Sequence, residues 1–109
     1  MTRRHFGEFE QLLLYAVLHL QSEDEGACGP SIRRTIEART GRVISPGAIY
    51  TALTRLESRG FVRSTLGDPT PERGGKRKRF YRLRPSGDAA LRATQTTLEK
   101  MARLARLKA

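Results

Sequence analysis

The sequence contains one cysteine and no tryptophan, and it has no long run of apolar residues. With Cys28 alone, the chain can form neither an internal disulfide nor a cysteine-rich metal site, which fits a reducing compartment. No apolar run reaches the roughly 18 residues that a membrane-spanning helix needs. A basic start followed by apolar residues 12–18 resembles a secretory signal, but Glu8 and Glu10 interrupt it. We therefore expect a cytoplasmic protein with no membrane partner.

The sequence also lacks the residue groups on which catalysis and metal binding depend. We find no paired nucleophile and base, and Gly74, Gly75 and Lys76 do not have the spacing of a phosphate-binding loop. His5 and His19 have no cysteine or second histidine at a ligand spacing. These absences predict a protein that is not an enzyme and that carries neither a cofactor nor a metal ion.

Positive charge, in contrast, is in excess and is concentrated in one segment. The formal net charge is +10 over 109 residues, and residues 63–84 contain eight Lys or Arg against two Asp or Glu. A solubilising excess would be spread along the chain, whereas a local excess indicates a polyanionic partner, with nucleic acid as the leading candidate. A chain of this length forms one domain with a modest core, which a partner subunit would help to stabilise.

Residues 45–60 read as a helix with one apolar face and one polar face. Ser45 is suited to the N-cap, Pro46 to the first helical position, and Gly60 to a left-handed end. The apolar stripe contains Ile49, Leu53 and Leu56, and the opposite side contains Gly47, Thr51, Thr54, Arg55 and Ser58. Hydroxyl and guanidinium groups suit base edges, and glycine permits close approach to a backbone. An ordinary surface helix with a polar outside is the alternative.

Two more helices are expected before this one. Apolar residues recur at helical spacing between residues 8 and 21, and Ile32 and Ile36 mark a second helix from about Pro30 to just before Gly41. Arg33 and Arg34 either touch phosphates or form a solvated face. Three successive helices, the last with a polar face, predict a helix-turn-helix arrangement.

A β-hairpin is expected after the third helix. Residues 61–66 and 76–83 have strand-like composition, and residues 67–75 are dense in turn formers. The hairpin would act as a wing along the duplex, and its cations would meet phosphates or enter the minor groove. These cations are Lys76, Arg77, Lys78 and Arg79. The alternative is a solvated basic edge strand that prevents aggregation.

The C-terminal segment, from about Ser86, reads as an amphipathic helix for dimerisation. Its seam contains Leu91, Leu98, Met101, Ala102 and Ala105, broadened by Leu104 and Leu107. In the first helix, Leu14, Tyr15 and Leu18 lie off the main stripe and require a second covering surface, either a partner subunit or a ligand cavity. We predict a dimer interface at Leu14, Leu18, Leu91, Leu98, Met101 and Ala105, and an effector pocket near Tyr15 and Leu18. A helix folded back on its own domain is the alternative.

The motifs at residues 45–57 and 75–83 resemble those of the PadR family of bacterial transcriptional regulators. The resemblance extends from the first helix to Leu91, and the short last helix is similar to that of the family's small subgroup. It implies a winged-helix homodimer that binds a pseudo-palindromic operator, usually as a repressor, and often responds to a small aromatic or cationic effector. It also implies that Tyr50 contacts the DNA backbone. Arg84 stands where the family usually has a threonine, so Ser86 is expected to cap the last helix.

The sequence thus predicts a mainly α fold with a small β-hairpin. Residues 1–84 would form a winged-helix DNA-binding domain, and residues 85–109 a dimerisation helix within the same compact unit. The DNA-contacting residues would be Ser45, Gly47, Tyr50, Thr51, Thr54 and Arg55, together with the wing cations. A protein that binds nucleic acid without regard to sequence, through its basic wing, is the rival interpretation.

Overall fold

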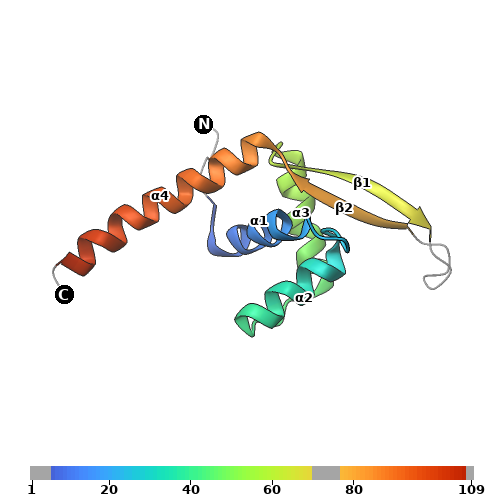
Figure 1. Ribbon diagram of the computed structural model, residues 1–109, viewed down its shortest axis with the longest axis horizontal. Coiled ribbons are helices and arrows are strands. Elements are labelled where there is room, and N and C mark those ends of the chain that lie inside the picture. The colour runs from blue at the N-terminus through green and yellow to red at the C-terminus, as the bar shows by residue number, and fades with distance from the viewer. Residues whose placement is uncertain (1–5, 70–76, 108–109) are drawn as a thin grey trace.

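Three helices pack their apolar faces together, and a hairpin and a long last helix extend from them to opposite sides (Figure 1). The computed structural model describes residues 6–69 and 77–107. Its elements are α1 (Glu8–Leu20), α2 (Gly29–Thr40), α3 (Pro46–Ser58), β1 (Val62–Pro69), β2 (Arg77–Leu83) and α4 (Pro85–Leu107). The predicted mainly helical fold with a two-stranded antiparallel hairpin is confirmed.

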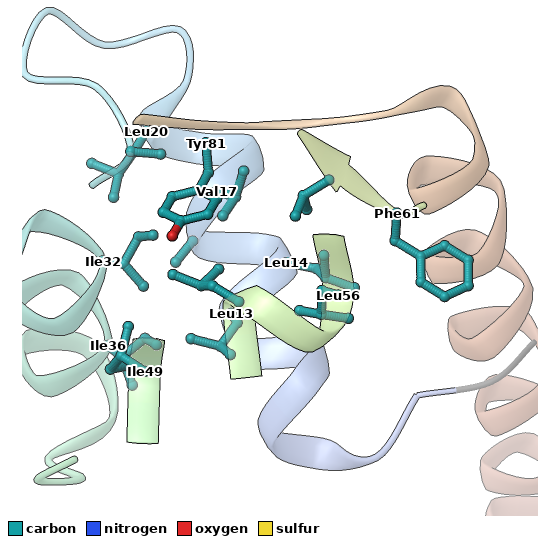
Figure 2. Close-up of a cluster of buried hydrophobic side chains, with 14 of the residues drawn as sticks. Leu13, Leu14, Val17, Leu20, Ile32, Ile36, Ile49, Leu56, Phe61 and Tyr81 are labelled. Atoms are coloured by element: carbon teal, nitrogen blue, oxygen red, sulfur yellow. The ribbon is translucent and has the colours of Figure 1, made fainter. Parts of the chain in front are cut away.

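The core lies where the three helices converge (Figure 2). Leu13 of α1, Ile32 of α2 and Leu56 of α3 have no measurable exposure, as their spacing along each helix predicts. Val62 of β1 and Tyr81 of β2 close the core from the side of the hairpin. Burial of this apolar surface holds α3 in place and leaves its polar side facing outward.

The ends of α3 form as the sequence predicts. The Ser45 hydroxyl accepts a hydrogen bond of 3.1 Å from the amide of Ala48, and Pro46 occupies the first turn. Beyond the helix, Gly60 has a φ of 83°, a left-handed conformation that costs glycine little. The beginning and the end of α3 are therefore set by local chemistry.

The turn between α2 and α3 is fixed by contacts from both helices. Gly41 ends α2 with a φ of 72°, and Ile44 is buried in the core. The Arg33 Nε donates a hydrogen bond of 2.8 Å to the Ile44 carbonyl, and the same nitrogen lies 3.2 Å from a carboxylate oxygen of Glu37. Arg33 thus links α2 to the turn that leads into α3.

The hairpin differs from the prediction near its tip. The sequence predicts residues 67–69 in the turn, but β1 continues to Pro69, with an irregularity in register between Leu66 and Pro69. Lys76 lies outside the described residues. At the base of the hairpin, the Tyr81 amide donates a hydrogen bond of 2.8 Å to the Ala27 carbonyl. The hairpin is therefore anchored to the segment that leads into α2.

The last helix has two different halves. Leu91 and Thr94 are buried against the rest of the chain, whereas Leu98 and Met101 are 52% and 62% exposed. The second half projects away from the helical core (Figure 1). This projection and the extended hairpin account for a radius of gyration of 15.6 Å, compared with about 13 Å for a compact chain of this length.

Three predictions for this region are wrong. Leu14 and Leu91 are buried within the chain, with 0% and 2% exposure, so neither is available to a partner subunit. The buried stripe of α1 is wider than its spacing suggested, because Leu14 joins the core, where it lies beside Leu56 of α3 (Figure 2). Ser86 does not cap α4, which begins at Pro85, and its hydroxyl instead donates to the Gly60 carbonyl.

No helix within the described ranges is long and apolar enough to cross a membrane.

Candidate nucleic-acid interface

The outward face of α3 carries short polar side chains and one arginine. Gly47, Thr51, Thr54 and Arg55 are all exposed, whereas Ile49, Leu53 and Leu56 anchor the opposite face. Arg55 has no ion-pair partner among the residues that the structure describes. The face is therefore free of bulky obstacles, and its guanidinium group is available to an external acceptor.

Tyr50 stands at the edge of this face nearest the hairpin. Its side chain is 63% exposed, which is unusual for a large aromatic residue in so small a domain. It lines one cavity together with Arg79 and Tyr81 of β2, so the first half of α3 lies beside the second strand. A phenol hydroxyl and a guanidinium group at one edge suit contact with a phosphate.

The structure divides the basic segment of the wing between two faces. Side chains alternate along β2, so Arg77 and Arg79 share the face of Tyr81, which is the face nearest α3. Lys78 points to the other face, together with Phe80, and is half-buried. The sequence treated these cations as equivalent, but in the structure Arg79 lines the cavity beside α3, whereas the Arg77 Nε donates a hydrogen bond of 2.7 Å to the Gly67 carbonyl.

A hydrogen-bond network joins the end of α3 to the wing. The Glu57 carboxylate accepts bonds from the Ser64 amide at 3.1 Å and from the Ser64 hydroxyl at 2.8 Å. One amino group of Arg79 donates to the same hydroxyl at 3.0 Å. Sequence reasoning missed this network, because a seven-residue separation across a turn does not by itself place two side chains together.

The sequence does not decide whether Arg33 and Arg34 of α2 contact phosphates or form a solvated face. In the structure, both side chains bond to acceptors within the chain. Arg33 braces the turn, and Arg34 pairs with Glu25 at 2.9 Å. Since both guanidinium groups already have acceptors, α2 offers less to a polyanion than α3 and the wing do.

Tyr81 is a second residue whose role the sequence did not reveal. Burial raises the pKa of its hydroxyl above the ordinary value of 10.0, and the Glu57 carboxylate adds to the rise, while Arg79 opposes it. The strand pattern placed Tyr81 in β2 but gave no indication that its hydroxyl would lie beside these charged groups.

The region proposed for an effector lies away from this surface, between α1 and α4. Tyr15 and Leu18 are 42% and 39% exposed, and the Tyr15 hydroxyl donates a hydrogen bond of 3.0 Å to Gln95. Both residues line an open groove of about 410 Å³ that also contacts Leu91 and Arg92. The two residues predicted for an effector therefore share one groove.

Comparison with known proteins decides the family. The model of the transcriptional regulator PadR-like family matches residues 17–93, which is most of the chain and includes the helix-turn-helix and the hairpin. The chain belongs to the PadR-like family of transcriptional regulators. This family consists of regulators rather than enzymes, and the sequence prediction on both points is confirmed.

A curated transcriptional regulator is also similar to this chain. The transcriptional regulator Rv3488 of Mycobacterium tuberculosis is 38% identical over 66 residues, which are 61% of this chain and 58% of that protein. The match thus spans little more than half the length of this curated relative.

Solved structures show the same fold. A PadR family regulator from Clostridium difficile R20291 has a TM-score of 0.70 and 20% identity, covering 93% of this chain and 97% of that one. Bacillus subtilis PadR in complex with operator DNA has a TM-score of 0.63 and 18% identity, covering 78% of this chain and 46% of that one. These likenesses confirm the predicted winged-helix arrangement.

Proposed function

We propose that this PadR-like protein is a sequence-specific DNA-binding regulator whose α3 enters the major groove. The observation that carries the proposal is the exposed polar face of α3. On this face Arg55 is available to an external acceptor, and Tyr50 lies at the edge beside Arg79 of β2. The structural neighbour bound to operator DNA has the same fold, which supports this use of the surface. Such a regulator acts in the bacterial cytoplasm.

Within this surface, we propose that base reading and backbone contact are divided between α3 and the wing. Thr51, Thr54 and Arg55 would meet base edges, because the first half of such a helix enters the groove. Ser45, Gly47 and Tyr50 would lie against the backbone at the start of the helix. Arg77 and Arg79 would meet phosphates, and Lys76, which lies outside the described residues, remains assigned to the wing by sequence alone.

We also propose a homodimer formed through the projecting half of α4. Leu91 and Thr94 begin a stripe with alternating steps of three and four residues, and the stripe continues through Leu98, Met101 and Ala105 beyond the domain. An exposed apolar stripe with coiled-coil spacing can pack against the same stripe of a second copy, or against α1 of that copy. Leu18, exposed on α1, stays in the proposed interface. Two copies would present paired helices to a pseudo-palindromic operator and, as a repressor, would block transcription from it.

An effector, in this proposal, binds in the groove beside Tyr15 and Leu18. That groove lies against α4, so a small aromatic or cationic compound there would favour one spacing of the two reading helices. Finding that such a compound binds without changing operator affinity would rule out this mode of regulation.

The decisive test of the proposed function is a specificity ratio. Duplexes would first be selected from a random pool by the full-length protein, and a selected duplex and its scrambled counterpart would then be titrated at one salt concentration. Specific readers gain about 10³-fold or more over random duplex. Equal affinity for both duplexes would favour the rival, a protein that binds nucleic acid without regard to sequence.

A further inference from the structure

The turn between α2 and α3 exposes one apolar side chain. Val43 is 81% exposed, whereas the next residue, Ile44, is 7% exposed and belongs to the core. Exposed apolar residues are common on protein surfaces, so exposure alone does not give Val43 a role. Two further features distinguish it: the backbone on both sides of Val43 is held, and the turn places it at the start of α3.

The backbone is held first on the α2 side of Val43. The Arg42 amide donates a hydrogen bond of 3.1 Å to the Thr40 hydroxyl, and the Arg42 guanidinium group pairs with Glu8 of α1 at 2.8 Å. On the α3 side, the Ile44 carbonyl accepts a hydrogen bond of 2.8 Å from α2. A valine side chain has one torsion with restricted rotamers, so it loses little conformational entropy when it makes a contact. The turn therefore presents this apolar group in a nearly fixed position.

Val43 lies beside the exposed end of α3. It precedes the N-cap residue Ser45 by two positions, and two residues span at most about 7 Å. The first three residues of the helix, 46–48, are all exposed, so this end is open to solvent. In the proposed function the first half of α3 enters the major groove, and Val43 reaches the groove together with it.

The major groove offers one apolar group to such a side chain. Thymine exposes its C5 methyl group there, whereas the edges of adenine and guanine and the N4 amino group of cytosine are polar. The valine side chain has no polar atom, so against a polar edge it would leave a donor or acceptor of the base without a partner, which is costly. Thymine is therefore the base that Val43 favours.

We propose that Val43 is a specificity-determining residue that packs against the C5 methyl group of a thymine in the major groove. The inference deepens the proposed function and rests on it, because it requires α3 to lie in that groove. Val43 adds an apolar contact to the polar contacts that Thr51, Thr54 and Arg55 make from the face of α3.

The first experiment removes each partner of this contact in turn. Each thymine of the selected duplex would be replaced singly by deoxyuridine, which keeps the O4 acceptor and lacks only the methyl group. For the full-length wild-type protein, we expect at least one thymine at which the replacement lowers affinity about fourfold, the equivalent of one buried methyl group. Val43→Ala should bind the thymine and deoxyuridine duplexes alike at that position.

Arg55→Ala is the matched control on the same surface. It should weaken binding to both duplexes by the same factor and so leave the difference between thymine and deoxyuridine in place. Because the Val43 side chain is exposed, Val43→Ala should unfold at the same urea concentration as wild type. A change in its affinity is then not a change in folding.

Two results would overturn the proposal for a protein that still prefers the selected duplex. One is that no thymine methyl group affects affinity, which would leave Val43 without a base contact. The other is a methyl effect that persists in Val43→Ala, which would assign the methyl group to another residue, such as the exposed Ala48. In both cases the proposed function stands. If the protein shows no preference for the selected duplex, the proposed function fails, and the thymine contact fails with it.

The second experiment repeats the selection from a random pool with Val43→Ala. Compared with the wild-type selection, the thymine preference should be lost at the position found with deoxyuridine and the other base preferences should be kept. An unchanged set of selected sequences would also overturn the proposal.

Discussion

The Glu57 carboxylate at the end of α3 holds both the amide and the hydroxyl of Ser64 in β1, at 3.1 and 2.8 Å. This pair spans the turn between the helix that we propose to read bases and the strand that begins the wing. Because Arg79 donates to the same hydroxyl, the two parts of the proposed DNA surface are fixed relative to each other at one point.

Replacing Ser64 with alanine should loosen this junction. The variant loses the hydroxyl bond to a half-buried carboxylate and the bond from Arg79, so we expect the free energy of unfolding to fall by about 1–2 kcal/mol. Urea denaturation measures the change. Ser58→Ala, at an exposed position at the end of α3, is the control and should differ from wild type by less than about 0.5 kcal/mol. Similar stabilities for the two variants would argue against a role for the pair.

Gly87→Ala should be strongly destabilising. The start of α4 approaches the Phe61 carbonyl so closely that an added Cβ would collide with backbone. Backbone cannot give way as a flexible side chain can, so we expect a loss of about 2 kcal/mol or more. Gly47→Ala is the matched control, because a Cβ there meets nothing within 4 Å. It should stabilise α3 by up to about 1 kcal/mol. Thermal unfolding that shows equal effects would contradict this account of the α4 docking.

Leu98→Glu should yield a monomer if the projecting half of α4 forms the dimer. A carboxylate buried in an apolar seam costs several kcal/mol unless it finds a partner. Sedimentation velocity gives the mass directly. Ala93→Glu adds the same charge at an exposed position off the stripe, so it should leave the oligomeric state unchanged. A dimer mass for Leu98→Glu would place the interface elsewhere.

Arg55 and Arg79 should respond differently to the DNA sequence. Arg55→Ala should cost about 1–3 kcal/mol on the selected duplex and relax base choice, with smaller losses on scrambled duplex. Arg79→Ala should weaken binding to both duplexes alike and reduce the salt slope by about 0.9 for each phosphate that the variant no longer neutralises. Lys78→Ala should weaken binding less, because Lys78 lies on the other face of β2. Binding titrations over several salt concentrations distinguish the three, and identical losses for Arg55→Ala on both duplexes would remove α3 from base reading.

Stability at high pH should depend on Tyr81. Its pKa in the folded protein is raised above 10.0 by burial, so the unfolded chain releases this proton at lower pH than the folded protein does. The contribution is therefore present below about pH 10 and is lost as the pH rises through the folded pKa. Tyr81→Phe should lose less stability than wild type between about pH 9 and about pH 11. Equal losses in urea denaturation at the two pH values would contradict this assignment.

Helical spacing and local chemistry allowed much of the fold to be predicted. Ser45, Pro46 and Gly60 set the ends of α3 through interactions within a few residues, so their effect can be read without knowing the fold. Ile32 and Ile36 are buried for the same reason, since a helix with one apolar stripe has one way to face a core.

Features that depend on several elements at once could not be predicted in this way. Leu14 lies off the main stripe of α1, and only the packing of the other elements around α1 decides whether it meets the chain's own core or a partner. The strand pattern of residues 76–83 likewise did not show which cations of the wing face α3, because that depends on how the hairpin docks. The cavity at Tyr81 combines three elements and has no local signature.

The contact between Phe6 and Thr94 has a consequence for biosynthesis. The Phe6 amide donates a hydrogen bond of 3.2 Å to the Thr94 hydroxyl, and the Phe6 ring meets Phe61 edge to face at a centroid distance of 4.9 Å. On the ribosome, the Phe6 segment that leads into α1 therefore lacks its contact with α4 until residues near Thr94 have emerged. A nascent chain halted after the wing would leave the Phe6 segment without this contact and accessible to chaperones, and release from them would await the translation of residues near Thr94.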